Sequence, residues 1–195
     1  MNSLNGKLLQ RSLSKVLHNK LAIDIAEVLI LLLLGAIAIT LHANLRIPTQ
    51  MPGKYGIIFM TIIMGARLCS KYKFSATIAV FGAVSVLMFN VLGFKDPFMP
   101  VIYMFIGIVI DVLFISFPKL SDKAWFVALT AGIAWMIIPI LRIMIFALFG
   151  YMHGVPKYAP IVPFISHIIF GCFGGLFAFS ILKLSGKLSK NNVQE

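Results

Sequence analysis

Long apolar runs, separated by short polar or basic segments, constrain this chain more than any other feature of its sequence. Of its 195 residues, 60% are hydrophobic and only 12% are charged, whereas a soluble domain carries roughly 45–50% apolar and about 25% charged residues. A core of this size cannot hide such a surplus, so the chain needs lipid as a second apolar solvent. A spanning helix takes about 20 mainly apolar residues, and backbone that faces lipid must be helical. We therefore expect six spanning helices, over residues 21–43, 55–68, 74–92, 98–117, 124–151 and 159–184.

The lysine and arginine residues predict the orientation of these helices, because cytoplasmic loops of membrane proteins are enriched in them. With the N-terminus inside, twelve of the 17 Lys and Arg residues fall in cytoplasmic segments, four in outer segments and one, Arg142, within a helix. The sequence thus predicts an all-α, polytopic protein of the cell membrane, a six-transmembrane-helix bundle with its N- and C-termini inside. We expect a basic cytoplasmic N-terminal segment (1–20), a six-helix membrane domain (21–184) and a cytoplasmic tail (185–195).

The basic character of the chain has a topological explanation. The net charge is +11, but the basic residues lie at helix ends, so we expect no nucleic-acid partner. A basic start followed by an apolar run is also typical of a signal peptide. The run 21–43 is too long for one and ends without a small-residue cleavage site, so it is interpreted as a retained first helix.

Motifs for catalysis or metal binding are missing from the sequence. It contains no Gly-x-Ser-x-Gly, no Walker sequence and no His-Glu-x-x-His pair. Cys69 and Cys172 fit no metal or redox spacing. We therefore expect no enzyme activity, no metal and no cofactor, with any ATP hydrolysis carried out by partner subunits.

Two charged residues lie inside the apolar runs, where an unpaired charge is unfavourable. Arg142 follows the start of its run by about 18 residues, which at about 1.5 Å per residue places it in the outer part of the bilayer. It either snorkels to the outer interface or anchors an anionic group of a ligand, a task that suits its planar fork of donors. Asp111 lies nearer the inner face, too far away to pair with Arg142. It either bonds to a neighbouring helix or inner loop, or takes part in ion or proton coupling.

Other polar and aromatic residues gather near the outer ends of the predicted helices. Individually, each fits a structural role such as an end-cap or the interfacial aromatic belt. Together they predict a small-molecule site that opens outward and is closed below. A guanidinium with a lysine nearby in sequence indicates a carboxylate or phosphate, and Trp and Tyr rings can stack on a ligand ring. The predicted ligand-binding residues are Arg142, Asn90, Tyr103, Trp135, His167, Asn44, Gln50 and Lys54.

The region around the first outer loop resembles a known family of transport subunits. Arg46, Ile47 and Pro48 precede a second apolar run that ends in the Gly-Ala-Arg-Leu sequence of residues 65–68. With six helices in 195 residues and both termini inside, the chain is similar to the substrate-binding S components of energy-coupling-factor (ECF) vitamin transporters, most closely the biotin-type S component. The residue-level likeness covers about residues 35–93. The biotin-type loop usually continues with Pro-x-Thr-x-Gln, where this chain has Met-Pro-Gly-Lys-Tyr at 51–55, and this difference leaves the vitamin open.

The resemblance implies a substrate-binding subunit of an ECF-type ABC importer. Such a subunit binds a vitamin or related micronutrient at its outer side and associates with a membrane T subunit and two cytoplasmic ATPases. The family docks on its T subunit through small residues four apart on the first helix. Ala22 and Ala26 match that spacing here, with Ala36 and Thr40 as the weaker pair. Small residues at this spacing also pack helices within one chain.

Two other functions fit the same sequence. An independent small-molecule transporter or channel would use the outer polar residues without any ATPase. A membrane scaffold or assembly protein would use the small-residue faces and bind no ligand. An independent transporter would take up its substrate without partner subunits, whereas an ECF substrate-binding subunit needs them. A scaffold would bind no small molecule, whereas an ECF substrate-binding subunit binds one.

Overall fold

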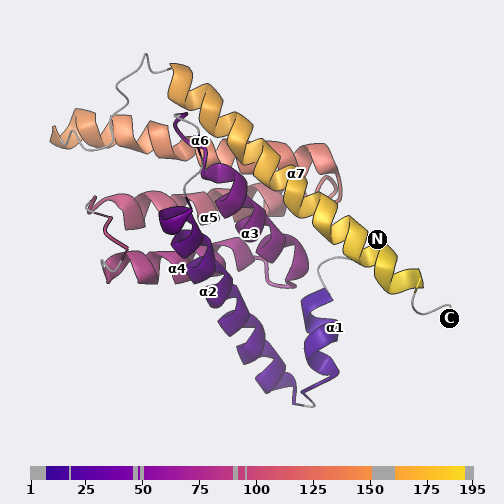
Figure 1. Ribbon diagram of the computed structural model, residues 1–195. Coiled ribbons are helices and arrows are strands. Elements are labelled where there is room, and N and C mark those ends of the chain that lie inside the picture. The colour runs from indigo at the N-terminus through magenta and orange to yellow at the C-terminus, as the bar shows by residue number, and fades with distance from the viewer. Residues whose placement is uncertain are drawn as a thin grey trace.

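The computed structural model describes residues 8–17, 19–45, 48, 51–89, 92–94, 96–150 and 161–191. The regular structure of these residues is entirely α-helical, as the sequence predicts (Figure 1). The seven helices are α1 (Leu8–Ser14), α2 (Lys20–Asn44), α3 (Gly56–Cys69), α4 (Ser75–Met88), α5 (Met99–Ser116), α6 (Ala124–Phe149) and α7 (Ile161–Asn191).

Four of these helices, α2, α5, α6 and α7, are long and apolar enough to cross a membrane. Helices α3 and α4 are also apolar but have only 14 residues each, or about 21 Å of helix against a hydrocarbon core of about 30 Å. By the length and hydropathy of its helices the chain is a multi-pass membrane protein, which confirms the class predicted from the sequence. The structure differs from expectation in three places: the basic N-terminal segment contains a helix, α1, α4 ends at Met88 rather than at residue 92, and α7 continues past residue 184 to Asn191.

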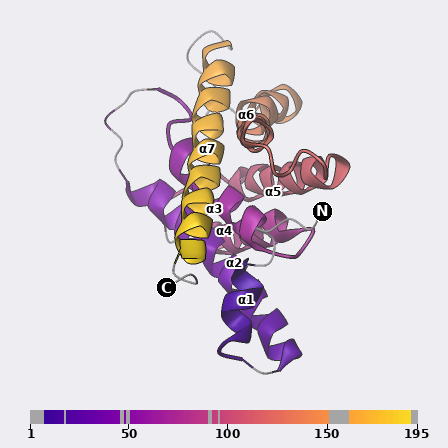
Figure 2. The same cartoon turned by 90° about the vertical axis from the view of Figure 1, so that its right-hand side faces the viewer.

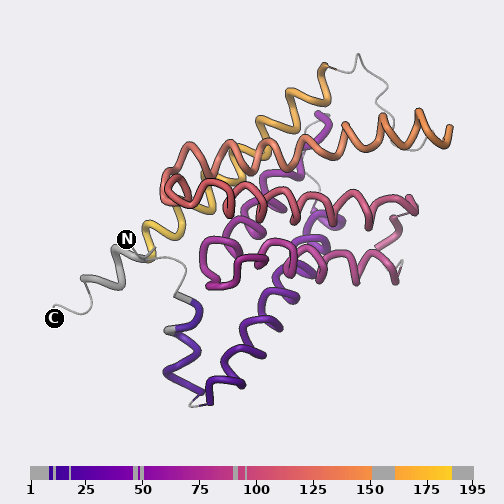
Figure 3. Tube along the Cα trace, turned by 180° about the vertical axis from the view of Figure 1, so that it is seen from behind, coloured from indigo at the N-terminus to yellow at the C-terminus, as the bar shows by residue number. Residues whose placement is uncertain are grey.

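The helices alternate in direction along the chain. Helices α4, α5 and α6 lie side by side and run back and forth, and α2, α3 and α7 cross them (Figures 1 and 3). Figure 2 shows α7 passing across α3, which is one of its two main neighbours, the other being α6. Helix α1, the start of α2 and the end of α7 lie toward the same end of the bundle (Figure 1).

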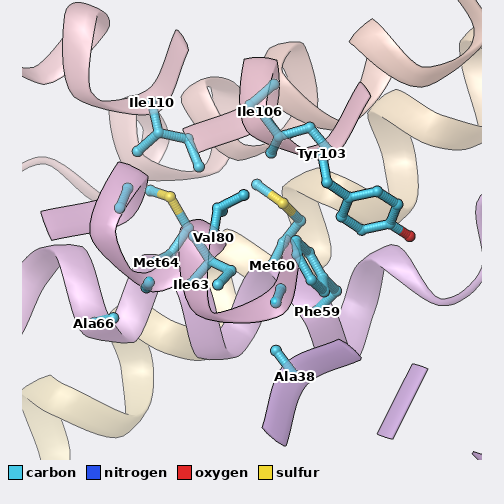
Figure 4. Packing of buried hydrophobic residues seen from close by; sticks show 14 of the residues in the cluster. Ala38, Phe59, Met60, Ile63, Met64, Ala66, Val80, Tyr103, Ile106 and Ile110 are labelled. Atoms are coloured by element: carbon cyan, nitrogen blue, oxygen red, sulfur yellow. The ribbon is translucent and has the colours of Figure 1, made fainter. Parts of the chain in front are cut away.

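An apolar core fills the space between the crossing helices. Figure 4 shows Phe59, Met60 and Met64 of α3 facing Ile106 and Ile110 of α5, and all five side chains are fully buried. Unbranched methionine side chains adapt to the irregular spaces that crossing helices leave. The core is therefore closed by side-chain packing in the middle of the bundle.

The outside of the bundle is apolar as well. Large aliphatic side chains recur at every fourth position along α2 and are exposed. An apolar surface of this extent is unsuited to water and suits the lipid bilayer that the sequence predicts as a partner. The exposed residues of this stripe are Leu21, Ile25, Leu29, Leu33 and Ile37.

Helices α2 and α4 touch backbone to backbone at two glycines. A Cβ atom added to Gly35 would lie 1.6 Å from the carbonyl oxygen of Ala79, and one added to Gly82 would lie 2.0 Å from that of Leu32. Both obstacles are main chain, which cannot rotate away as a side chain can. Small residues allow this close approach, and the Ala79/Ala83 pair visible in the sequence lies at the same crossing.

We expect Gly35→Ala to lower the unfolding temperature of the purified protein, because overpacking typically destabilises by about 1–3 kcal/mol. Gly65→Ala is the matched control, since Gly65 is also helical and a Cβ there meets nothing within 4 Å. That change should leave the free energy of unfolding unchanged or raise it by up to about 1 kcal/mol. Thermal unfolding in one detergent measures both variants, and equal unfolding temperatures would contradict the close crossing.

Two buried carboxylates hold the short loop between α3 and α4. Glu27 of α2 is fully buried and accepts hydrogen bonds from Ser70 Oγ at 2.6 Å and from the Lys71 backbone N–H at 3.1 Å. Asp111 of α5, also fully buried, accepts from the backbone N–H and the hydroxyl of Thr77, both at 2.7 Å. Non-helical backbone at membrane depth is tolerated only where protein satisfies its polar groups. The two acids do this for the loop and for the first turn of α4.

Arg67, near the end of α3, joins this loop to α5. Its Nε lies 3.0 Å from Asp111 Oδ1, and its Nη1 donates a 3.3 Å hydrogen bond to the Tyr72 carbonyl. The guanidinium carbon also lies 4.8 Å from the centroid of the Phe114 ring, a favourable cation–π position. Asp111 thus bonds to neighbouring helices, as one of its two alternatives predicted, and Arg67 is its ion partner.

We expect Asp111→Asn to destabilise the bundle by about 3–5 kcal/mol, because it leaves Arg67 buried without its counter-charge. Thr77→Val is the milder comparison, since it removes one hydroxyl donor and keeps the ion pair, for a loss of about 1 kcal/mol. The free energy of unfolding in mixed micelles measures both changes. A loss no larger for Asp111→Asn than for Thr77→Val would show that the ion pair contributes little.

Candidate functional site

Aromatic side chains from five helices converge at the opposite end of the bundle from the α3–α4 loop. They lie at the end of α2, at the start of α3, at the start of α5, in the middle of α6 and in the first part of α7. Two more come from the turn before α3 and from the segment before α5. We call this set the aromatic cluster; its members are His42, Tyr55, Phe59, Phe94, Tyr103, Trp135 and His167.

The imidazole of His42 contacts most of the other rings of the aromatic cluster. It stacks on Tyr55 with ring centroids 4.8 Å apart, and the centroids of Phe94 and Trp135 lie 5.9 and 6.1 Å away. The Tyr103 hydroxyl and His42 Nδ1 form a hydrogen bond of 3.1 Å. Tyr103 is almost fully buried, and a buried tyrosine hydroxyl needs such a partner. His42 therefore lies at the centre of the aromatic cluster and satisfies the buried Tyr103 hydroxyl.

A turn over residues 52–55 covers the aromatic cluster. Trp135 Nε1 donates a 2.9 Å hydrogen bond to the Gly53 carbonyl, and the Trp135 ring stacks on His167 at 6.1 Å between centroids. His167 Nδ1 is in turn 2.7 Å from the Pro163 carbonyl oxygen. Gly53 has a φ of 77°, and a Cβ there would lie 2.8 Å from the His167 ring. Only glycine combines this backbone conformation with this contact.

A buried ion pair lies next to the aromatic cluster. Arg142 Nη1 is 2.8 Å from Asp96 Oδ2, with the two side chains 14% and 4% exposed. Arg142 Nη2 also donates to the Met99 sulfur at 3.3 Å. Met99 precedes Tyr103 by about one turn of α5, and Arg142 follows Trp135 by about two turns of α6.

The structure brings together some of the predicted ligand-binding residues. Tyr103, Trp135 and His167 are in the aromatic cluster, and Arg142 lies beside it. Lys54 is in the covering turn, with its Nζ 5.2 Å from the centroid of the Tyr55 ring.

The other predicted site residues lie elsewhere. The Asn44 amide donates to the Thr40 carbonyl of its own helix at 2.8 Å, so it does not point into the aromatic cluster. Asn90 and Gln50 lie outside the described residues.

The small residues predicted for partner docking lie on α2. Ala22, Ala26 and Ala36 are partly exposed and Thr40 is exposed. The Thr40 hydroxyl donates to the Ala36 carbonyl at 2.7 Å. These residues are accessible to another membrane protein, and docking through them stays a prediction.

Sequence reasoning missed His42, Tyr55, Phe59, Phe94 and Asp96. The sequence contained an indication of His42, because it is a lone histidine near the predicted outer end of the first apolar run, two residues before Asn44. Phe59 had none, because one more phenylalanine in an apolar run is most often a core residue. Asp96 follows the outer loop and lies beside Pro97, where a helix-start role is the usual interpretation.

The aromatic cluster and Arg142 together present ring faces, two imidazoles and a guanidinium. Among the residues that the structure describes, no three His, Cys, Asp or Glu side chains gather as metal ligands. No family model, no curated protein and no solved structure matches this chain.

We expect Trp135→Phe to destabilise the protein by about 1–3 kcal/mol, because the Gly53 carbonyl loses its donor. Trp125→Phe is the matched control on the same helix, since Trp125 is 54% exposed on the apolar outside.

The Trp125→Phe variant also allows a fluorescence test. Trp125 and Trp135 are the two tryptophans of the chain, so this variant leaves Trp135 as the sole tryptophan and as a reporter of the aromatic cluster. The fluorescence emission of Trp135 should be blue-shifted and poorly quenched by acrylamide. Efficient quenching would contradict the burial of Trp135.

Proposed function

We propose that this chain is the membrane-embedded substrate-binding subunit of an ECF-type ABC importer. Its substrate is a vitamin or related micronutrient with an anionic group, and biotin is the leading candidate. The observation that carries the proposal is the aromatic cluster with Arg142 beside it, converging from five helices at one end of the bundle. The Lys and Arg bias assigns that end to the outside of the cell membrane.

In this proposal α2 to α7 are six spans with the N- and C-termini inside. The alternating directions of the helices support it (Figure 1), as does the bias of basic residues toward one side. The short helices α3 and α4 span because Glu27 and Asp111 satisfy the start of their connecting loop and the first turn of α4. The bilayer is locally thin for these two spans, or adjusts to them.

The ligand contacts follow from the chemistry of the side chains. Phe59, Tyr103 and Trp135 pack on one another with ring centroids 5.0–6.1 Å apart, so these rings separate to admit a ring of the ligand. The carboxylate of the ligand binds the planar fork of Arg142. Access requires the turn over residues 52–55 to lift, because Gly53 is bonded to Trp135 and lies on His167. The ligand enters from the outer side, because the turn over residues 52–55 opens there and the buried rings close the site on the inner side.

Release to the inside depends on other subunits. Ala22 and Ala26, or Ala36 and Thr40, dock on a membrane T subunit, and two cytoplasmic ATPases supply the energy. Exposure of these small residues on α2 supports this assignment. The same helix carries the exposed aliphatic stripe, so a docking partner meets an apolar face.

We expect mass spectrometry of protein purified gently in detergent to detect one vitamin-like compound per chain, because a ligand enclosed by rings and a guanidinium dissociates slowly. Protein purified empty should bind one member of a vitamin panel. Protein that stays empty after incubation with the panel would favour a scaffold without a ligand. Uptake into liposomes by this chain alone would instead favour an independent transporter.

We expect the double variant Arg142→Gln/Asp96→Asn to weaken binding of that carboxylate ligand roughly 10- to 100-fold, the value of a charged hydrogen bond. The double change avoids leaving Asp96 buried and unpaired, which a single change at Arg142 would do. Isothermal titration with the ligand and its neutral amide measures the effect, and the amide should bind both proteins equally. Unchanged affinity for the carboxylate would remove Arg142 from the site.

A further inference from the structure

Arg142 already holds a carboxylate. Its Nη1 is 2.8 Å from Asp96 Oδ2, and the Asp96 side chain is only 4% exposed. A carboxylate is also the group that the proposed function places on Arg142. The anion of the ligand and the anion of Asp96 therefore have the same partner.

The two oxygens of Asp96 have separate tasks. Oδ1 accepts a 3.0 Å hydrogen bond from the Phe98 backbone N–H, which is an Asx turn leading into α5. Oδ2 faces Arg142. The turn needs an acceptor but no charge, so a neutral amide at this position would keep the turn and release Arg142.

The ion pair is placed between the outer end of the bundle and the aromatic cluster. Met99, which contacts Arg142, is four residues from Tyr103 on α5 and so lies about 6 Å away along the helix. Trp135 is seven residues from Arg142 on α6, about 10 Å along that helix and on the same face. A ligand of vitamin size spans these distances, with its ring among the aromatic residues and its anion at Arg142.

We propose that Asp96 is a built-in competitor for the anion site at Arg142, and that a ligand binds by exchanging its own carboxylate for that of Asp96. This inference rests on the proposed function for the location of the ligand. The exchange keeps the guanidinium paired throughout, which matters because a buried charge without a partner is strongly unfavourable. It also selects against neutral analogues, which carry no charge to exchange and therefore leave the Arg142–Asp96 pair in place.

The test measures binding of benzoate, a ring with a carboxylate, and of benzamide, its neutral counterpart, by the rise in unfolding temperature with concentration. Asp96→Asn should tighten benzoate binding at least about 10-fold, because a buried like charge next to the ligand anion is removed. Binding of benzamide should be unchanged. Asp122→Asn is the matched control: Asp122 is exposed in the segment before α6, and its loss changes the net charge equally but should leave both affinities within about 2-fold.

Two further variants test whether a change in benzoate affinity comes from the charge of Asp96 and acts through Arg142. Asp96→Ser retains an acceptor for the Phe98 N–H and should behave as Asp96→Asn, which covers poor folding of either one. Arg142→Gln/Asp96→Asn should lose the gain in benzoate affinity. Unchanged benzoate affinity in Asp96→Asn, an equal gain for benzamide, or no benzoate binding by any variant would overturn the competitor role.

The results also separate this inference from the proposed function. A gain for benzoate in Asp96→Asn, with no vitamin retained or bound, would leave the competitor in place and reject the vitamin importer. A vitamin that is retained by the protein, and that binds Asp96→Asn with the same affinity as the wild type, would support the importer and reject the competitor role of Asp96.

Discussion

Lipid offers no hydrogen-bond partner and no counter-charge, so every polar group at membrane depth in this chain has to be satisfied by the protein. The end of the bundle that holds the α3–α4 loop is organised by that requirement. Glu27 and Asp111 come from two different helices and satisfy the start of this loop and the first turn of α4, and Arg67 joins the loop to Asp111. These bonds hold the connection between two helices of only 14 residues each.

The same requirement acts at the end of the bundle that holds the aromatic cluster. Asp96 gives Arg142 its counter-charge, and His42 and the Gly53 carbonyl satisfy the buried Tyr103 and Trp135. These bonds join the side chains of the aromatic cluster and the ion pair beside it, whereas the bonds at the other end join helix ends to a loop. In the proposed function, a ligand replaces them with the same chemistry: a carboxylate for the guanidinium and ring faces for the aromatic residues.

Depth along a helix was a good guide to some site residues. The sequence placed Arg142 in the outer part of α6 and Tyr103 near the outer end of α5, with Trp135 lower on α6. The Tyr103 and Trp135 rings are in contact, and Arg142 lies about two turns beyond Trp135. Depth could not tell which way a side chain points. Asn44 is at the right depth but bonds to its own helix, and His42, one half-turn earlier, points to the rings. The direction depends on the rotation of α2 against α3 and α5, which the near-uniform apolar character of these helices does not reveal.

The sequence by itself determined the class of protein and the approximate positions of its helices, and it predicts the side of the membrane on which the basic residues lie. Those features depend on local hydropathy and on the charge of single loops, which neighbouring residues decide. Only the tertiary structure decided which charge pairs with which, and which rings meet. Glu27 and Ser70 are 43 residues apart and Trp135 and Gly53 are 82 apart. Such contacts follow from where helices cross, and the crossings depend on backbone contacts such as that of Gly35 with Ala79. The spacing of small residues indicates that a helix is approached closely, but it does not specify which helix approaches it.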